Sequence, residues 1–223
     1  MGDELEQELN PSELGTKDYW EKIYSEEINN FEDHGDVGEV WFGKTNALKV
    51  VKCISEDLNL SRTDKIVDIG CGNGWTLVQL AREGFTDLVG VDYVPSAINL
   101  ARSVLEDNQV DPCKVQLMVS DVLNPDDDLF LYEFRVIHDK GTYDAISLNP
   151  DDSVGKRKMY VKNVHRILAD GGHLVLSSCN WTEAELKSQF TDYFQVVHTI
   201  DAPAMRFGGK TGQLVTNMVF KKK

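Results

Sequence analysis

Residues 66–74 read Ile-Val-Asp-Ile-Gly-Cys-Gly-Asn-Gly, a short apolar run that leads into three glycines at alternate positions. A strand buried on both faces of a parallel sheet needs such an apolar run, and glycine lets the following backbone turn sharply and approach a ligand closely. Asp92 ends a second apolar run, 88–91. An acid at the end of the second strand is suited to accept hydrogen bonds from ribose hydroxyls. The pattern predicts a parallel sheet that binds a nucleoside cofactor.

The glycine spacing separates two kinds of nucleoside cofactor. Dinucleotide-binding folds have the pattern G-x-G-x-x-G, whose third glycine allows close packing of helix on strand. Here the glycines are Gly70, Gly72 and Gly74, and the third dinucleotide position holds Trp75, whose indole would crowd that contact. Asp68 would repel a diphosphate, whereas it suits a cation such as a sulfonium or an amino group. We therefore expect a cationic nucleoside cofactor.

Strand and helix patterns alternate from Lys65 onward, which predicts an α/β fold with a doubly wound, mostly parallel sheet and helices on both faces. Strands are expected over 66–69, 88–91, 115–119, 134–139, 174–178, 194–200 and 213–221. Helices are expected over 17–31, 47–58, 75–82, 96–106 and 156–168, with a last one after a capping box at Thr182 and Glu185. Residues 1–13 are acidic and expected to be disordered, and residues 14–223 should form one domain.

The fourth strand has two candidate positions, 134–139 and 143–148. The first is favoured because it puts Asp139 at the carboxyl end of the strand, where open α/β sheets bind their ligands. Gly171 and Gly172 are expected to end the long helix before them and to open the fifth strand.

The formal net charge of −14 argues against a nucleic-acid partner, because neutralising phosphates requires a basic surface, and it suits a basic protein partner. No apolar run approaches the ~18 residues of a membrane span, and the acidic N-terminus is unlike a signal peptide. We expect a cytoplasmic protein without a membrane partner, and a nuclear fraction stays open. The cysteines and histidines show no ligand spacing, so reduced thiols and no metal are expected.

Several motifs resemble one enzyme family. The segment 68–74 is similar to the first motif, D/E-x-G-x-G-x-G, of the class I S-adenosylmethionine-dependent methyltransferases. The run 138–145, His-Asp-Lys-Gly-Thr-Tyr-Asp-Ala, resembles a signature of the eukaryotic methyltransferase-like protein-lysine methyltransferases. Shorter segments resemble the branch that methylates a lysine of translation elongation factor 1-alpha, at 14–16, 19–20, 39–43, 147–151 and 178–182. The resemblance runs from Leu14 to the C-terminus and implies a seven-stranded sheet with an antiparallel final strand.

The resemblance also implies which residues hold S-adenosylmethionine. They are Trp41, Asp68, Gly70, Cys71, Gly72, Asn73, Asp92, Tyr93, Asp121, Val122 and Asp139. Asp121 would meet the adenine amino group, the Val122 N–H a ring nitrogen, and Trp41 would belong to an N-terminal flap over the cofactor. Each has a structural alternative, since Asp121 could be a turn residue, and Trp41 and Tyr93 could simply pack. Cys71 is interpreted as a small apolar filler rather than a nucleophile.

Methyl transfer to lysine requires in-line placement and a neutral amine, since only its lone pair can attack. Asp139, Tyr143 and Trp181 are the expected catalytic residues, with Asn149 nearby, and the Trp181 ring could hold the lysine stem and its ammonium. The segment 149–151 also resembles part of the N-P-P-x tetrapeptide of amino-group nucleic-acid methyltransferases. It lacks the second proline and the aromatic residue, so that interpretation is discounted.

The expected function is S-adenosylmethionine-dependent methylation of a lysine on translation elongation factor 1-alpha, by a monomer. Two alternatives stay open at this point. A small-molecule methyltransferase would have the same cofactor-binding part of the domain and would differ in its substrate pocket. A non-catalytic cofactor-binding protein would have lost turnover, although the intact acids Asp68, Asp92, Asp121 and Asp139 speak against that.

Overall fold

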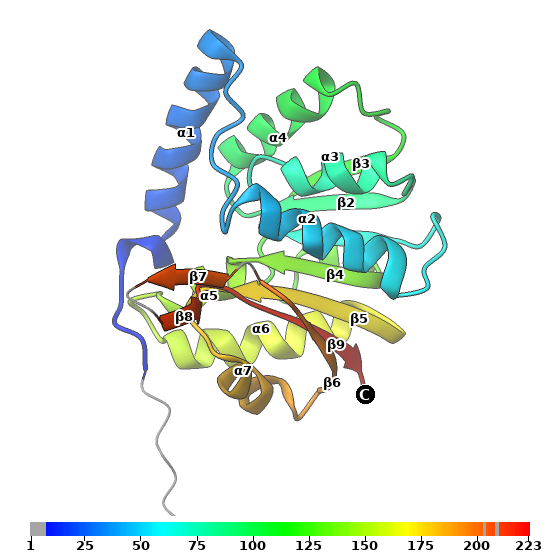
Figure 1. The fold of residues 1–223 in the computed structure, drawn as a ribbon. Helices are drawn as coiled ribbons and strands as arrows, with labels where there is room; N and C mark the ends of the chain where they lie inside the picture. The colour runs from blue at the N-terminus through cyan, green and yellow to red at the C-terminus, as the bar shows by residue number, and fades with distance from the viewer. Residues whose placement is uncertain (1–7, 203, 208–209) are drawn as a thin grey trace, which may run out of the picture.

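A seven-stranded sheet with the order β3-β2-β1-β4-β5-β9-β6 forms the centre of the molecule (Figure 1). The computed structural model describes residues 8–202, 204–207 and 210–223. The strands are β1 (Ile66–Ile69), β2 (Leu88–Asp92), β3 (Val115–Val119), β4 (Phe134–Lys140), β5 (Leu168–Ser178), β6 (Phe194–Ile200) and β9 (Thr216–Lys222). Strands β1 to β5 pair in parallel, and β9 lies antiparallel between β5 and β6. The predicted doubly wound sheet is confirmed.

Helices cover both faces of the sheet and enclose two apolar cores. One core lies under α2 (Lys44–Lys52), α3 (Trp75–Arg82) and α4 (Pro95–Asp107), and the other under α5 (Thr142–Ser147), α6 (Ser153–Ile167) and α7 (Glu183–Phe190). Successive strand residues point to opposite faces, so Ile66 belongs to the first core and Val67 to the second. All four positions of β1 are buried, which explains why every residue of the strand except Asp68 is apolar.

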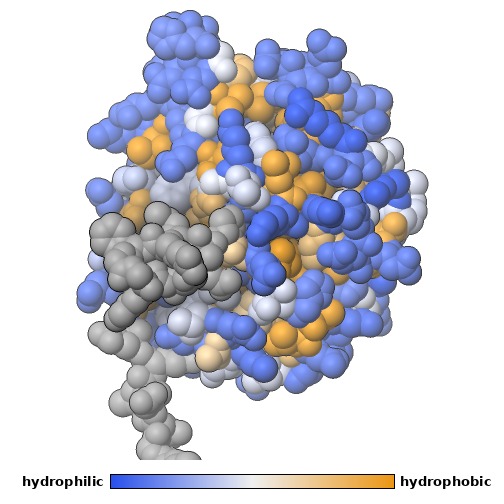
Figure 2. Space-filling model, in the orientation of Figure 1, coloured by the Kyte–Doolittle hydropathy of each residue, from blue (hydrophilic) through white to orange (hydrophobic). Residues whose placement is uncertain are grey.

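Helix α1 (Lys17–His34) contacts α4 and stands at the carboxyl edge of the parallel strands (Figure 1). Its outer end is hydrophilic in the space-filling view (Figure 2). The chain before it is also attached to the domain. Glu8 forms an ion pair with Arg157 at 2.8 Å, and a 3-10 turn, η1 (Glu13–Gly15), precedes α1. Residues 1–7 of the expected disordered tail lie outside the described residues, whereas residues 8–13 contact the domain.

Two expected boundaries are corrected. Helix α6 ends at Ile167, and β5 already begins at Leu168, so Gly171 and Gly172 lie inside the strand. The pairing of β4 with β5 shifts register there, and Gly171 has a φ of 69°, so the glycines form a bulge rather than a stop. The last strand begins at Thr216 because Gln213 ends β8 (Lys210–Gln213), which pairs with β7 (Ala204–Phe207) in a separate small sheet.

The fourth strand is β4, as the sequence favours, and the alternative segment forms α5 instead. The capping box at Thr182 and Glu185 is present at the start of α7. Helix α2 continues into a π-helical turn, η2 (Cys53–Asp57), and a short turn, η3 (Asp128–Leu131), precedes β4. Within the described residues, no helix has the length and apolar character of a membrane span.

Candidate functional site

A cavity lies at the carboxyl ends of β1, β2 and β4, with α1 along one side. Its lining comes from segments far apart in the chain: the loop after β1, the ends of β2 and β3, the loop before α2, and α1 itself. Open α/β sheets bind ligands at this edge, because the strand order reverses there between β1 and β4. The cavity is therefore the candidate site.

The loop after β1 is shaped by its glycines. Gly70 and Gly72 have φ angles of 65° and 52°, a region that L side chains rarely adopt. A Cβ atom at Gly70 would lie 1.9 Å from the Thr142 Oγ1 atom, and one at Gly72 would lie 2.6 Å from the Tyr24 hydroxyl. Gly74 is the N-cap residue of α3, and a Cβ atom there would lie 3.0 Å from the Cβ of Ala101. At Gly70 and Gly72 the cavity wall is therefore formed by backbone without a side chain, whereas Gly74 allows α3 and α4 to pack closely.

Asp92 ends β2 and faces the cavity, with 5% of its surface exposed. Its two carboxylate oxygens accept hydrogen bonds from the Gly72 N–H at 3.1 Å and the Val94 N–H at 3.0 Å. Burial raises its pKa to about 6, while those two backbone hydrogen bonds oppose the shift. Each oxygen keeps acceptor capacity, so the group is placed as the ribose interpretation requires.

Four other sequence-predicted cofactor residues line the cavity beside Asp92. Tyr93, Asp121 and Val122 lie at the ends of β2 and β3, and Cys71 lies within the glycine loop. The Asp121 side chain accepts a hydrogen bond from the Leu123 N–H at 2.9 Å. Burial raises the pKa of the Cys71 thiol well above its usual value, which keeps the sulfur protonated and unreactive.

The loop that carries Trp41 is tied to the glycine loop through Asn73. The Asn73 amide donates hydrogen bonds to the carbonyl oxygens of Val37 at 2.7 Å and Glu39 at 3.3 Å. The Trp41 ring packs edge-on against Trp20 of α1, with ring centroids 5.3 Å apart. Together with Tyr24 and Phe42, these two tryptophans form an aromatic wall of the cavity.

Asp68 lies beneath the cavity rather than in its lining. It is 2% exposed, and its Oδ1 atom is 2.6 Å from Nδ1 of the buried His138, its neighbour in register on β4. The expectation that Asp68 contacts the ligand directly is therefore corrected. Asp68 can act on the cavity only through its charge. The negative charge of Asp68 favours the protonated form of Lys140, a cavity residue whose pKa burial lowers.

Asp139 is also displaced from its expected place. It is fully buried, and it accepts hydrogen bonds from the Thr142 N–H at 2.9 Å, the Tyr143 N–H at 3.1 Å and the Tyr160 hydroxyl at 2.5 Å. Burial raises its pKa to about 7, against the effect of the Tyr160 hydrogen bond. The carboxylate accepts hydrogen bonds from the first N–H groups of α5, which have no partner within the helix. Asp139 therefore positions Thr142 rather than touching the cavity.

The structure likewise places Tyr143 and Trp181 in the core rather than in the cavity lining. The Tyr143 side chain is fully buried, and its hydroxyl donates to Oε1 of Gln189 at 2.5 Å. The Trp181 indole is 3% exposed and donates to the Ser147 hydroxyl at 3.0 Å, while the Arg157 guanidinium lies 4.9 Å from its ring centroid. Neither ring is available to hold a lysine side chain in this arrangement.

Asn149 does line the cavity, but its amide is already engaged. It donates to the Gly15 carbonyl oxygen at 2.6 Å and accepts from the Lys156 ammonium at 2.6 Å. Asp144, also in the lining, accepts from the Ser178 hydroxyl at 2.5 Å and the Cys179 N–H at 2.7 Å. These contacts join α5, α6 and the loop after β5 around one side of the cavity.

Sequence reasoning missed several lining residues. They are Trp20, Tyr24, Glu27, Glu39, Phe42, Lys140, Thr142, Asp144, Cys179 and Asn180. Lys140, Thr142 and Asp144 lie in the run 138–145, in which the sequence predicts site roles for Asp139 and Tyr143 alone. The apolar face of α1 includes Trp20 and Tyr24, but helical spacing alone does not reveal which element that face contacts.

Comparison with known proteins identifies relatives of the whole chain. Residues 60–222 match a family model described as a methyltransferase domain. A Mus musculus protein named EEF1A lysine methyltransferase 2 is 41% identical over 213 residues, which cover 96% of this chain and 85% of that protein. The Saccharomyces cerevisiae protein-lysine N-methyltransferase EFM4 is 34% identical, over 96% of this chain and 97% of its own. The crystal structure of N-methyltransferase NodS from Bradyrhizobium japonicum, in complex with S-adenosyl-L-homocysteine, has a TM-score of 0.64 at 17% identity, over 91% of this chain and 98% of its own.

Proposed function

Since the chain belongs to the EEF1A lysine methyltransferase 2 family of methyltransferase-domain proteins, we propose that it methylates a lysine of translation elongation factor 1-alpha, with S-adenosylmethionine as the donor. The observation that carries this proposal is the identity of 41% over 96% of the chain, because the match extends well beyond the residues that line the cavity. We further propose a cytoplasmic monomer without a nucleic-acid or membrane partner, and the −14 net charge supports the absence of nucleic-acid binding.

The cavity fits an adenosyl cofactor in three respects. Asp92 offers acceptors for the ribose hydroxyls, and Gly70 and Gly72 leave backbone where a Cβ atom would fill the wall. Tyr93, just after β2, and Asp121, just after β3, line the part of the cavity that we assign to the adenine base. The bound cofactor supplies an activated methyl group on a cationic sulfonium. The aromatic wall and the buried negative charge of Asp68 suit that cation.

The contribution of the protein is to bring a neutral lysine amine into line with the methyl group. Glu27 and Glu39 line the cavity and attract a protonated lysine, whose stem can lie against Trp20 and Trp41. A dry aromatic surface lowers the pKa of an amine, because burial disfavours its charged form. We assign Asp139 and Asn149 as positioning residues, since both hold neighbouring backbone through hydrogen bonds.

Recognition of the protein substrate is supported by charge. Exposed acidic side chains on and after α1 include Glu26, Glu32, Asp33 and Asp36, and this outer end is hydrophilic in Figure 2. A negative surface beside the cavity raises the rate of encounter with a basic partner. We propose that this end of α1 guides the elongation factor toward the cavity.

The test is labelling of purified elongation factor 1-alpha by the purified full chain with radiolabelled S-adenosylmethionine. We expect methyl groups on one lysine, located by mass spectrometry, and no label after that lysine is changed to arginine, which keeps its proton. The Asp92→Ala enzyme is expected to lose labelling, whereas Asp87→Ala, a change at the opposite end of the strand, keeps it. The same labelling is run in parallel on a cytosolic extract. An unlabelled elongation factor beside a different labelled protein in the extract would refute the substrate, and label in small molecules alone would refute protein methylation.

A further inference from the structure

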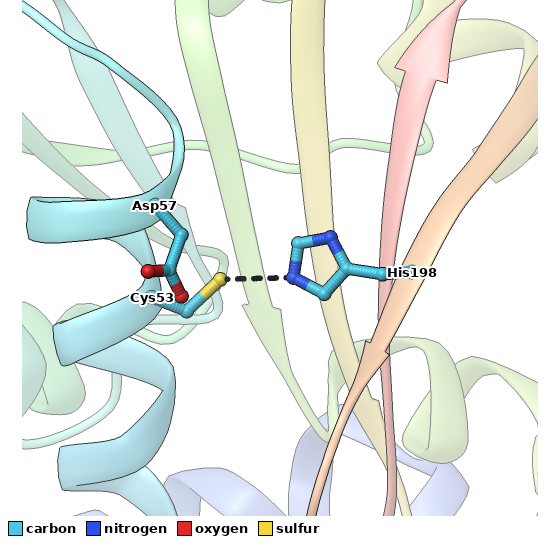
Figure 3. Close-up of side chains that lie close together, drawn as sticks. All are labelled: Cys53, Asp57 and His198. Atoms are coloured by element: carbon cyan, nitrogen blue, oxygen red, sulfur yellow. Dashed lines mark hydrogen bonds between the residues drawn. The ribbon is translucent and has the colours of Figure 1, made fainter.

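A cluster of three potential metal ligands lies outside the cavity lining. It contains Cys53 and Asp57, at the two ends of η2, and His198 on β6 (Figure 3). The Cys53 Sγ atom lies 3.5 Å from Nε2 of His198, and one ligand atom from each of the three residues lies within 4.8 Å of the others. Thiolate, imidazole and carboxylate are the three groups that proteins use to bind zinc.

The separation of the sulfur and the nitrogen matches a shared zinc ion. Zinc bonds of about 2.3 Å to sulfur and about 2.0 Å to nitrogen, at a tetrahedral angle, place the two ligand atoms about 3.5 Å apart. The observed distance between Cys53 Sγ and His198 Nε2 is 3.5 Å. The Asp57 carboxylate supplies a third ligand at the outer side, where the residue is exposed and water can fill the fourth position.

A bulge in β6 is what turns His198 toward Cys53. Val196 pairs with Phe220, and His198 pairs with the next residue of β9, Val219, so one extra residue is inserted between them. Val196 therefore packs with the core under α7, whereas Ile200, two residues beyond His198, packs with the core under α2. Without the bulge, strand alternation would keep His198 on the α7 side.

The other two ligands also come from an irregular element. Helix α2 widens into the π-helical turn η2, which carries Cys53 at its start and Asp57 at its end. Such turns are rare and are found frequently at functional sites. Two independent departures from regular structure thus converge on the same three side chains.

We propose that Cys53, Asp57 and His198 bind a zinc ion that joins the end of α2 to β6. Binding forms a zinc–sulfur bond and releases the Cys53 thiol proton to solvent, while the imidazole donates its lone pair. The sequence spacing implies no metal, because 145 residues separate Cys53 from His198.

The simpler interpretation is a hydrogen bond from the thiol to the imidazole with no metal. Cobalt(II) distinguishes the two, because it replaces zinc and shows a thiolate-to-cobalt absorption band only when a cysteine is a ligand. The full chain, freed of metal by a chelator and kept reduced with a phosphine, is titrated with Co²⁺ and then with Zn²⁺. We expect one equivalent of Co²⁺ with the thiolate band, displacement by Zn²⁺, and release of a proton in calorimetry.

Variants assign the ligands. Cys53→Ser is expected to remove the band and the proton release, and His198→Gln and Asp57→Asn to weaken Zn²⁺ binding by more than the roughly 10–100-fold that loss of a supporting partner causes. Cys113→Ser, which changes an exposed thiol elsewhere, should leave both readouts unchanged. Circular dichroism checks that each variant is folded. Absence of the band in the wild type, or its persistence in folded Cys53→Ser, would overturn the site.

Discussion

The Asp92 carboxylate accepts a hydrogen bond from the Gly72 N–H at 3.1 Å, which joins the end of β2 to the loop after β1. One residue therefore both shapes the glycine loop and presents acceptors to the cavity. The effects of substituting Asp92 and Gly72 can be distinguished experimentally. Replacing Asp92 removes hydrogen-bond acceptors from the cavity, whereas a side chain at Gly72 takes up space in it.

Gly72→Ala should weaken binding of S-adenosylhomocysteine by at least about tenfold in calorimetry, since the new Cβ would meet the Tyr24 hydroxyl at 2.6 Å. Gly35→Ala is the matched control. It has a similar φ of 68° with no atom within 4 Å of the new Cβ, so it shares the backbone strain of about 1 kcal/mol without touching the cavity. Equal affinity in the two variants would contradict the placement of the Gly72 backbone at the wall of the cofactor cavity.

Asp92→Ala should cost about 1–3 kcal/mol of cofactor affinity, because ribose hydroxyls and two backbone N–H groups lose their acceptor. A 2′-deoxy analogue of the cofactor should lose affinity against the wild type and much less against the variant. The comparison is a double-mutant cycle between residue and ligand. An equal loss for both proteins would show that Asp92 does not contact the ribose.

Asp139 should make the protein less stable as the pH rises from about 4 to about 7. Its pKa is raised from 3.8 to about 7 in the folded state, so the folded protein keeps a proton that the unfolded chain has released. The stabilisation is complete below the unfolded pKa and is lost as the pH rises through the folded one, with a slope of up to about 1.4 kcal/mol per pH unit.

Asp139→Asn should remove this slope, because an amide does not titrate and can still accept from the Thr142 N–H. Urea unfolding of wild type and variant at several pH values between 4 and 8 measures the difference. Parallel stability curves for the two proteins would refute the assignment of the raised pKa to Asp139.

Trp41→Ala should weaken S-adenosylmethionine binding by about 1–2 kcal/mol, because the aromatic wall loses a ring that faces the cation. Trp75→Ala serves as the control, since the cavity lining includes Trp41 and not Trp75. Calorimetry on both variants gives the comparison. A larger loss for Trp75→Ala would reassign Trp41 to packing against Trp20.

Turnover on intact elongation factor 1-alpha should fall as ionic strength rises toward 1 M, where the screening length shortens to about 3 Å. The acidic end of α1 would then attract its partner less. Turnover on a short peptide that contains the target lysine should depend on salt much less. The same salt dependence for protein and peptide would argue against long-range guidance by α1.

The part of the site that lies close in the sequence was predictable. The segment from β1 to α3 is confirmed at its predicted boundaries, because an apolar run, three glycines and a helix start act locally. Asp92 and Asp121 were placed near the cavity because they follow strands whose carboxyl ends share one edge.

The orientation of side chains just past a strand could not be predicted. Asp139 and Tyr143 turn into the core because α5 starts at Thr142 and needs its first N–H groups satisfied, which depends on tertiary packing. The contribution of Trp20 and Tyr24 depends on where α1 docks. No local pattern encodes that position, so these residues emerge only from the three-dimensional arrangement.

The place of β9 has a consequence for biosynthesis. Strand β6 is made before β9, yet it joins the sheet only through β9, which pairs with β5 on its other side. A nascent chain can therefore assemble β1 to β5 before β9 has been synthesised. At that stage β6 has no pairing partner, and the edge of β5 can pair with other strands. Segment 216–222 pairs with β5 on one side and β6 on the other, so a single late segment completes both neighbours at once.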